Sequence, residues 1–498
     1  MQRIGIVDLG SNTARLVDFS YDPGGWFRLG HQIREPIRLG EGLGVERRLT
    51  GPALGRATDA LALFVDYAAS TDLGKLEVLG TSAVRDAENR DELLQRLEPL
   101  GLTVRVLSGT EEARLGVLAV SNGFELRDAW VMDLGGGSAQ LSLMEARRFA
   151  GGDAHPLGAV RLTERHLTDD PPRRRQIRAL EEAVDAELAE PLERMAEKRL
   201  PIVGMGGSLR NLARAAQKSR EYPLDLLHGY FLEQRDLEEL TDTLLGLTAA
   251  KRSRIPGIKA DRSDIILAAA LVYRRLLQKA AADGIWISGH GVREGAFFRR
   301  FLPPPHLIPA LRPFSVHNVL SHYAQAKGHI DLVRYLAARL FEQLQPLHDL
   351  GPRDSDLLDA AAQLQDIGLA VNYYRHDRHG AYLISSAPLN GFSHREQALI
   401  ALLVRYHLKG TPGLGRLKGL CREGDKRTLT ALTCILRLAD HLDRSRAGRV
   451  RELTVEIGKR AVKVRIESGD EPATEIRGVE TLTPLFEKAF ERRLKLVA

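Results

Sequence analysis

Long apolar runs are missing from this chain of 498 residues. A membrane-spanning helix needs about 18 or more consecutive apolar residues, and no stretch of the sequence reaches that length. The first three residues pass directly into a strand-like segment, without the pattern of a signal peptide. Cysteine is also scarce, because the chain has 2, Cys421 and Cys434, which excludes a disulfide scaffold and fits a reducing compartment. We therefore expect a cytoplasmic protein with no membrane segment.

Two common phosphate-binding motifs are missing as well. No glycine-rich loop continues as Gly-Lys-Ser or Gly-Lys-Thr, as a P-loop would, and none has the G-x-G-x-x-G spacing with a later acidic residue. The net charge of +6 suits a polyanionic partner. However, the sequence shows no recognition helix, zinc finger or paired-aromatic RNA pattern. We expect a phosphate-rich partner and no specific nucleic acid.

The composition that is present, 44% apolar and 27% charged, is that of a globular protein. The chain is too long for one core, so roughly three or four domains are expected. Prolines at 303–305 mark the clearest boundary. The predicted domains are 1–122, 123–302, 306–446 and 449–498.

The most informative segments are two glycine-containing hairpins at 4–19 and 130–144. In each, an apolar run ends in an aspartate, followed by a glycine loop and a second alternating run, which predicts two strands joined by a tight turn. The two align without a gap, with Asp8 on Asp133. Glycines let several backbone N–H groups approach one anion. This repeat indicates a duplicated domain that holds a phosphate between two matching loops.

Further candidate site residues lie at the ends of predicted strands and the starts of helices. Segments 202–208 and 286–295 each read as a strand, a glycine loop and a helix. Arg85 lies just past a buried strand, a usual place for ligand contacts in α/β sheets. Glu111 and Glu112 fall in the first turn of a predicted helix, where the helix dipole favours carboxylates even without a catalytic role. The spacing alone does not separate capping from catalysis for these two glutamates.

The C-terminal third changes character. Periodicity predicts helices over 329–344 and 354–365, within a mostly helical region. Alternation predicts a hairpin from 451–457 and 461–466, and we expect one amphipathic helix over 482–494. These last elements predict a small α+β domain at the end of the chain.

Six motifs follow one another along the chain: Asp8-Leu-Gly-Ser-Asn12, Thr81-Ser-Ala-Val-Arg85, Ser108-Gly-Thr-Glu-Glu-Ala-Arg114, Asp133-Leu-Gly-Gly-Gly-Ser138, Gly204-Met-Gly-Gly-Ser208 and Ser288-Gly-His-Gly-Val-Arg-Glu-Gly295. In this order they resemble the exopolyphosphatase/guanosine pentaphosphate phosphohydrolase (Ppx/GppA) family. The resemblance implies an α/β fold of two duplicated actin-like (sugar kinase/Hsp70/actin), ribonuclease H-like domains. Residues 314–498 resemble the C-terminal part of the long members, an all-α HD-like domain followed by a small α+β domain. A homodimer is also implied.

Matching positions imply roles for individual residues. Glu112 corresponds to the catalytic carboxylate, and Asp133 together with Glu112 to the site of a divalent cation, Mg²⁺ or Mn²⁺. Arg15 and Arg293 fall where the family contacts more distal phosphates or a nucleotide. The positions implied to bind phosphate are Asp8, Gly10, Ser11, Asn12, Arg85, Gly136, Gly137, Ser138, Gly206, Gly207 and Ser208.

One departure bears on activity, because Gln140 stands where the family usually has glutamate. An amide cannot ionise, so Gln140 can be neither a base nor a charged metal ligand. The first hypothesis is hydrolysis of the terminal phosphate of inorganic polyphosphate, with release of orthophosphate. The alternative enzymatic activity is removal of the 5′-phosphate of guanosine pentaphosphate. A polyphosphate- or (p)ppGpp-binding sensor with little turnover is the non-enzymatic alternative.

A second departure lies in the HD-like region. The counterparts of an HD metal site would be His329, Gln365-Asp366 and Asp440, with His379 and His407 as neighbours. A catalytic HD site needs an imidazole where this chain has Gln365, and a neutral amide is a poor substitute ligand. We therefore predict no metal and no second hydrolytic centre in this region.

Overall fold

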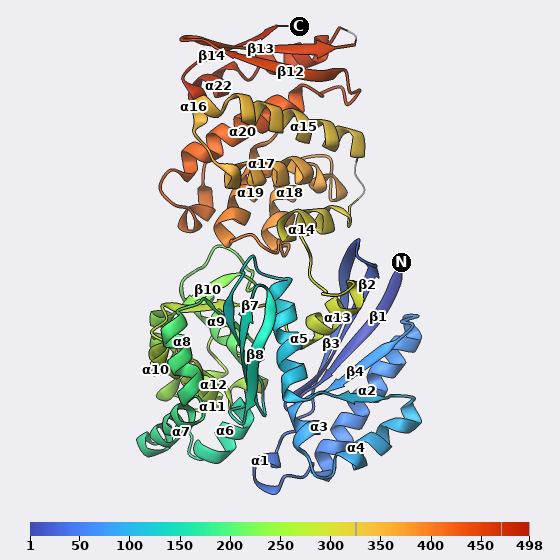
Figure 1. Ribbon diagram of the computed structural model, residues 1–498, viewed down its shortest axis with the longest axis vertical. Helices are drawn as coiled ribbons and strands as arrows, with labels where there is room; N and C mark the ends of the chain where they lie inside the picture. The colour runs from blue at the N-terminus through green and yellow to red at the C-terminus, as the bar shows by residue number, and fades with distance from the viewer. Residues whose placement is uncertain (324–325, 470, 498) are drawn as a thin grey trace. The chain divides into compact units, whose positions relative to one another are not determined.

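The computed structural model describes residues 1–323, 326–469 and 471–497, and the chain divides into two compact units. Unit 1 comprises residues 1–222 and 227–311, and unit 2 comprises residues 223–226 and 312–498. In Figure 1 unit 1 is drawn from blue to yellow-green, and most of unit 2 from yellow to red. Among the described residues, no helix is both long and apolar enough to cross a membrane.

Unit 1 contains a first mixed sheet with the strand order β3–β2–β1–β4–β5. Strands β1, β2 and β3 are antiparallel neighbours, whereas β4 and β5 continue the sheet in parallel with β1. The strands are β1 (Gln2–Leu9), β2 (Thr13–Asp22), β3 (Trp26–Pro36), β4 (Leu76–Gly80) and β5 (Val104–Val106). The helices of this half are α1 (Leu43–Glu46), α2 (Gly51–Ser70), α3 (Ser82–Asp86), α4 (Arg90–Leu97) and α5 (Gly109–Ser121), with a 3₁₀ turn, η1 (Glu98–Leu100).

The second sheet has the order β10–β11–β9–β6–β7–β8. Its strands are β6 (Ala129–Leu134), β7 (Ala139–Glu145), β8 (Arg148–His155), β9 (Ile202–Met205), β10 (Tyr230–Glu233) and β11 (Gly284–Ile287). The accompanying helices are α6 (Ala159–His166), α7 (Arg174–Glu187), α8 (Ala189–Lys198), α9 (Gly207–Ser219), α10 (Gln234–Leu245), α11 (Ala249–Arg252), α12 (Ile266–Lys279) and α13 (Val292–Phe301), with a 3₁₀ turn, η2 (Ala260–Arg262).

The two sheets repeat one topology, as the paired hairpins predict. Strands β6, β7 and β8 form an antiparallel meander, and β9 and β11 extend the sheet in parallel, so five strands match the first sheet and β10 is an addition at the edge. The register also repeats. Asp8 pairs across β1 and β2 with Arg15, and Asp133 pairs across β6 and β7 with Gln140. The two aspartates therefore end equivalent strands.

Apolar side chains explain why these elements fold together. The first half packs β1 and β2 against α2, whose start is capped by the Thr50 hydroxyl, which accepts from the Ala53 N–H at 3.3 Å. In the second half the first eight residues of α12 are apolar and all buried, as expected of a helix whose start lies in the middle of a large core. The glycine loops stay at the strand ends, outside both cores, where a ligand can reach them.

Unit 2 contains a helical part and a three-stranded sheet with the order β12–β13–β14. The helices are α14 (Leu311–Leu320), α15 (Lys327–Gln343), α16 (Gln345–His348), α17 (Pro352–Leu364), α18 (His376–Ser386), α19 (His394–Tyr406), α20 (Asp425–His441), α21 (Ala473–Glu480) and α22 (Thr483–Phe490), with 3₁₀ turns η3 (Ile367–Ala370) and η4 (Gly415–Leu420). The strands are β12 (Val450–Ile457), β13 (Ala461–Ser468) and β14 (Arg493–Val497). The predicted helices over 329–344 and 354–365 and the predicted hairpin are thus confirmed.

The single helix predicted over 482–494 is wrong. Helix α22 ends at Phe490, and Glu491 takes a left-handed conformation with φ of 57°. The chain then turns into β14, which pairs in parallel with β13. Apolar residues of β14 alternate over only five positions, so the sequence pattern could not be separated from the end of an amphipathic helix.

Candidate active site

A cleft in unit 1 brings the glycine loops of both halves together. It has a volume of about 740 Å³, including its open mouth. Its lining residues are Asp8, Gly10, Ser11, Asn12, Thr13, Arg15, Thr81, Ser82, Glu112, Asp133, Leu134, Gly135, Gly136, Gly206, Gly207, Arg210, Arg262, Gly291, Val292 and Arg293. Because the residues come from both sheets, the cleft depends on the association of the two halves.

The two hairpin loops are built alike and touch each other. In the first, the Gly10 N–H donates to the Thr13 carbonyl at 3.2 Å, and in the second the Gly135 N–H donates to the Ser138 carbonyl at 2.9 Å. A Cβ added to Gly137 would lie 2.8 Å from the Ser11 hydroxyl oxygen, closer than such atoms pack. A side chain at this position would displace the hydroxyl groups of Ser11 and Ser82, so glycine lets the two loops lie close together.

A third loop contributes a helix N-terminus. Gly206 has φ of +102°, and an added Cβ would lie 2.6 Å from the Leu134 carbonyl oxygen. Helix α9 begins directly after it, and glycine at the N-cap has no side chain to cap the first N–H groups. Gly207 packs against the Arg262 guanidinium, where an added Cβ would lie 2.5 Å from the guanidinium carbon. An uncapped helix N-terminus beside an arginine favours an anion.

The adjacent glutamates of α5 have different environments. Glu111 forms a capping box with Ser108, since its carboxylate accepts from the Ser108 N–H at 3.0 Å, and it is half-buried outside the cleft lining. Glu112 is 8% exposed and lines the cleft. The hydrogen bond from Ser108 holds the pKa of Glu111 down at about 2. The structure thus assigns the capping role to the first glutamate and leaves the second facing the cleft.

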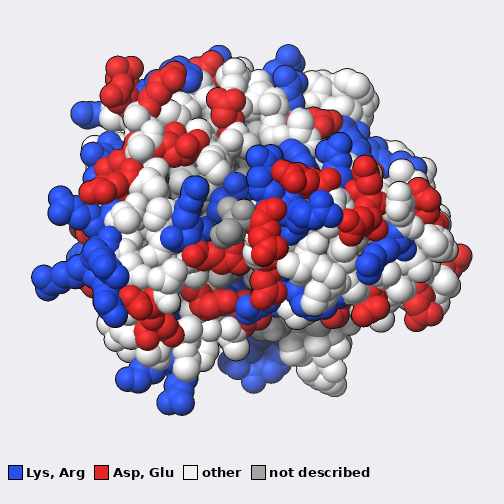
Figure 2. Space-filling model, turned by 90° about the horizontal axis from the view of Figure 1, so that it is seen from below, with Lys and Arg blue, Asp and Glu red and all other residues white. Residues whose placement is uncertain are grey.

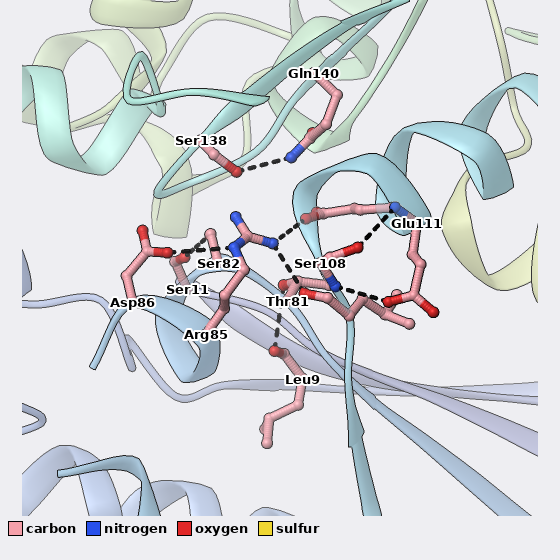
Figure 3. Close-up of polar contacts among 12 residues, drawn as sticks. Leu9, Ser11, Thr81, Ser82, Arg85, Asp86, Ser108, Glu111, Ser138 and Gln140 are labelled. Atoms are coloured by element: carbon pink, nitrogen blue, oxygen red, sulfur yellow. Dashed lines mark hydrogen bonds and ion pairs between the residues drawn. The ribbon is translucent and has the colours of Figure 1, made fainter. Parts of the chain in front are cut away.

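Arg85 holds the carboxylate of Glu112. Its Nη1 donates to Glu112 Oε2 at 2.9 Å and to the Leu107 carbonyl at 3.2 Å, and its Nε donates to Asp86 at 3.3 Å. Figure 3 shows the Arg85 guanidinium between Asp86 and the first turn of α5, where Ser108 and Glu111 form the cap. Arg85 contacts Glu112 but is not part of the cleft lining.

The carboxylates of the cleft are perturbed by burial. Desolvation raises the pKa of Glu112 to about 7, with Arg85 opposing the shift and Asp133 and Asp8 adding to it. Desolvation also raises the pKa of Asp133 to about 6, against the pull of Arg210. A carboxylate with a pKa near 7 is half ionised at neutral pH and basic enough to accept a proton from water. This value distinguishes Glu112 from its neighbour Glu111.

Positive charge faces these carboxylates. Burial lowers the pKa of Arg15, and the nearby guanidinium groups of Arg210 and Arg293 lower it further. Arg210 is anchored to the Gly289 carbonyl at 2.9 Å. Guanidinium groups stay charged in proteins, so this buried cluster is satisfied best by a polyanion. By contrast, both signs of charge are interspersed on the face of the molecule drawn in Figure 2.

The donor set fits a hard divalent cation. Asp8, Asp133 and Glu112 line one cleft and offer oxygen atoms, the ligands that Mg²⁺ and Mn²⁺ prefer. Each of Asp8 and Asp133 raises the pKa of Glu112 electrostatically, which shows that negative charge is concentrated here. Mg²⁺ is commonly held by one or two carboxylates and the phosphates of the substrate. The arrangement of the cleft suits that mode of binding.

Most of the predicted site residues meet in the cleft, and a few lie behind it. Ser138 Oγ accepts from the Gln140 amide at 2.9 Å, and Ser208 Oγ accepts from Arg262 at 3.3 Å, so both hydroxyls support the loops. Gln140 is 2% exposed. The residues outside the lining are Arg85, Gly137, Ser138 and Ser208.

Two arginines of the cleft were missed by sequence reasoning. Arg210 follows the third glycine loop by one turn of α9, so its placement near that loop could have been inferred from the helix period. Arg262 lies in the short 3₁₀ turn η2, far along the chain from any glycine loop. Only the fold brings Arg262 to the cleft, and no local pattern signals it.

Paired glycine loops, clustered arginines and a carboxylate with a raised pKa define an enzyme that hydrolyses phosphate bonds. The chain belongs to the Ppx/GppA phosphatase family. Residues 20–303 match the Ppx/GppA phosphatase family, and residues 311–475 match Ppx/GppA phosphatase, domain III.

Relatives of both named activities are similar to this chain. The exopolyphosphatase 1 of Mycobacterium tuberculosis is 31% identical over 321 residues, which cover 64% of this chain and 93% of that protein. The guanosine-5′-triphosphate,3′-diphosphate pyrophosphatase of Aeromonas hydrophila is 27% identical over 480 residues, covering 93% of this chain and 92% of that protein. The resemblance stated from the motifs is therefore confirmed.

Solved structures agree on the fold of the first part of the chain. An exopolyphosphatase-like protein is 30% identical, with a TM-score of 0.55, and covers 59% of this chain and 96% of its own. An exopolyphosphatase from Cytophaga hutchinsonii, at 24% identity and a TM-score of 0.57, covers 60% of this chain and 98% of its own. The α/β fold with two mixed sheets is thus shared with structures of this family.

Proposed function

We propose that this chain is an exopolyphosphatase, which hydrolyses the terminal phosphoanhydride bond of inorganic polyphosphate and releases orthophosphate. The observation that carries the proposal is the buried Glu112 carboxylate in a cleft lined by two phosphate-type loops and by arginines. The likeness to exopolyphosphatase 1 supports the choice of substrate. A polymer of phosphates presents repeated negative charge, which suits the cluster of Arg15, Arg210 and Arg293.

In this mechanism Glu112 accepts a proton from a water molecule, whose oxygen attacks the terminal phosphorus. The bond from that phosphorus to the bridging oxygen breaks, and the shortened chain leaves with the electron pair. The N–H groups of the loops around Gly10 and Gly136 and of the α9 N-terminus stabilise the charge on the non-bridging oxygens. A bound Mg²⁺ or Mn²⁺, held by Asp133 and Glu112, would neutralise phosphate charge at the same place.

The second candidate activity is removal of the 5′-phosphate from guanosine pentaphosphate. It is favoured by the Aeromonas hydrophila relative, whose similarity extends over 93% of this chain. The same cleft would bind guanosine pentaphosphate, with Arg15 and Arg293 contacting the more distal phosphates or the nucleotide.

Release of orthophosphate over time decides between these readings. Purified full-length protein is given polyphosphate or guanosine pentaphosphate, each with Mg²⁺ or Mn²⁺. Faster release from polyphosphate, at equal concentrations of terminal phosphate, supports the main proposal, and the reverse order selects the second. Binding of either compound without release would select a sensor, and Glu112→Gln protein is the blank for contaminating phosphatases.

Two expectations about assembly and domain type complete the proposal. The protein is proposed to form a homodimer, which light scattering of the full-length chain tests directly. The helices of unit 2, from α14 to α20, are proposed to form an HD-like domain, consistent with their match to domain III of the family.

A further inference from the structure

A cluster of buried polar side chains in unit 2 lies outside the proposed active site. Asp366 follows α17, His376 begins α18, and His407 follows the last residue of α19. These three are 4%, 7% and 0% exposed. One potential ligand atom from each lies within 4.8 Å of the others. The helices that carry them are drawn from yellow to orange in Figure 1.

The imidazoles are oriented as metal ligands are. The Nδ1 of His376 is 2.9 Å from the Tyr373 carbonyl, and the Nδ1 of His407 is 2.7 Å from the Val404 carbonyl. A carbonyl oxygen only accepts, so each Nδ1 carries the hydrogen and donates it. In the neutral ring the lone pair is then on Nε2. Donation from the other nitrogen to a backbone carbonyl is the usual way in which a metal-ligating histidine is fixed.

Both Nε2 atoms point at one carboxylate oxygen. His376 Nε2 lies 3.5 Å, and His407 Nε2 3.9 Å, from Asp366 Oδ1. Neither Nε2 has a hydrogen-bond partner within the described part of the chain, although both are buried. Two ligands at about 2.0–2.1 Å from a tetrahedral ion lie about 3.4 Å apart. The observed spacing is therefore close to that of a coordination shell.

The surroundings hold Asp366 in place without using Oδ1. Its other oxygen, Oδ2, lies 2.5 Å from Arg446 Nη2. His329 Nε2 lies 3.9 Å from the same Oδ2 and 3.4 Å from Asp440 Oδ1, and the Gln365 amide donates to that Asp440 oxygen at 3.3 Å. Arg446 thus holds Oδ2, which leaves Oδ1 to the two imidazoles, while His329 Nε2 and Gln365 Oε1 have no hydrogen-bond partner among the described residues.

Close backbone packing fixes the trio. An added Cβ on Gly368 would lie 2.0 Å from the His376 carbonyl oxygen, and one on Gly380 would lie 2.9 Å from Val404 Cγ1. These two glycines let η3, α18 and α19 approach closely enough for Asp366 to meet both imidazoles. The predicted neighbour His379 is only partly buried and is not in the trio, whereas His376, which the sequence did not single out, is.

We infer that Asp366, His376 and His407 form a site for one divalent transition-metal ion, such as Zn²⁺, separate from the oxygen-lined cleft of unit 1. Two imidazoles and one carboxylate are a common ligand set for Zn²⁺ and for iron(II), and they leave at least one coordination position open. This inference replaces the expectation of no metal in this region. The imidazole missing at Gln365 is supplied from two other helices.

The test uses full-length protein stripped with a chelator and then titrated with Co²⁺, whose visible absorption reports nitrogen and oxygen ligands of low coordination number. We expect one Co²⁺ per chain with this spectrum, displaced by one Zn²⁺. His376→Gln and Asp366→Asn should each lower the affinity at least 100-fold. His348→Gln is the matched control, because His348 is also buried in unit 2 but both its ring nitrogens are hydrogen-bonded.

Two results would overturn the inference. One is the absence of stoichiometric Co²⁺ or Zn²⁺ in the wild-type protein, and the other is unchanged affinity in a folded His376→Gln variant. X-ray absorption of the Zn²⁺-loaded wild type keeps the test decisive if a variant does not fold, because two imidazoles should be visible in the scattering. Fewer than two imidazoles would contradict the site. Neither measurement depends on phosphate release.

Discussion

At the scale of the residue, Glu112 carries the strongest prediction. Glu112→Gln keeps the size and polarity of the side chain but removes its proton affinity, so turnover should fall by about 10²–10⁴-fold, the usual contribution of a general base. Affinity for polyphosphate should change little. Phosphate release and equilibrium binding measure the two effects. Glu111→Gln is the control, since that side chain caps α5 outside the cleft, and equal losses in both variants would contradict the assignment.

The pH profile follows from the raised pKa of Glu112. The carboxylate must be ionised to accept a proton, and its pKa is about 7, so kcat should rise with pH through neutrality and level off above it. Arg85 lowers this pKa, and Arg85→Met should therefore move the rise to higher pH. Arg105→Met, which removes a partner of Glu111 and Glu77 but not of Glu112, should leave the profile in place. A profile unmoved by Arg85→Met would assign the rise to the substrate.

Gln140 can be tested through the metal requirement. Its amide donates to Ser138, and its backbone pairs with Asp133, so a carboxylate at position 140 would add negative charge beside the proposed cation site. We expect the wild type to be active, and Gln140→Glu to lower the Mg²⁺ concentration needed for half-maximal rate. Gln140→Met, uncharged and similar in size, should not do so. A wild type inactive with both Mg²⁺ and Mn²⁺ would favour a sensor.

At the scale of the element, the contact between loops depends on glycine. Gly158 precedes α6, and an added Cβ would lie 2.2 Å from the Gly137 carbonyl carbon, so backbone would have to move. Gly158→Ala should displace the second hairpin loop and lower kcat/KM by at least 10-fold, because small errors of alignment are costly in phosphoryl transfer. The melting temperature should fall as well, because overpacking a close contact is destabilising.

Gly151→Ala provides the comparison for Gly158→Ala. Gly151 lies in β8 of the same half, and nothing lies within 4 Å of an added Cβ. The kcat/KM of Gly151→Ala should stay near the wild-type value. If the two alanine variants behave alike, the glycine contact does not control loop position.

The elements also show what the sequence could and could not predict. The hairpins were predictable because strand alternation and glycine turns are local, and their ungapped match fixed the equivalence of Asp8 and Asp133. Strand β14 was not predictable, because it is defined by its pairing with β13, and no local sequence pattern indicates that pairing. Arg262 and His376 were missed for the same reason. Their roles arise from contacts between segments distant in sequence.

At the scale of the whole molecule, unit 1 holds every residue of the proposed active site. It has its own cores in both halves, and the relative from Mycobacterium tuberculosis is aligned over 93% of its length to 64% of this chain. We predict that residues 1–311 fold alone and release phosphate from short polyphosphates at a rate within about 10-fold of the full chain. Circular dichroism and phosphate release check this. A folded but inactive fragment would show that unit 2 is needed for catalysis.

The cap at the start of α5 has a consequence for insertions and deletions. Each residue of a helix is rotated by about 100° from the one before it, and this rotation alone separates the half-buried Glu111 from the buried Glu112. Loss of one residue between Ser108 and Glu111 would place Ala113 where Glu112 now faces the cleft, and insertion of one residue would place Glu111 there. Single substitutions in this turn keep the rotation of the helix relative to the cleft, whereas a change in its length does not. The number of residues between Ser108 and Glu112 therefore fixes which side chain faces the cleft.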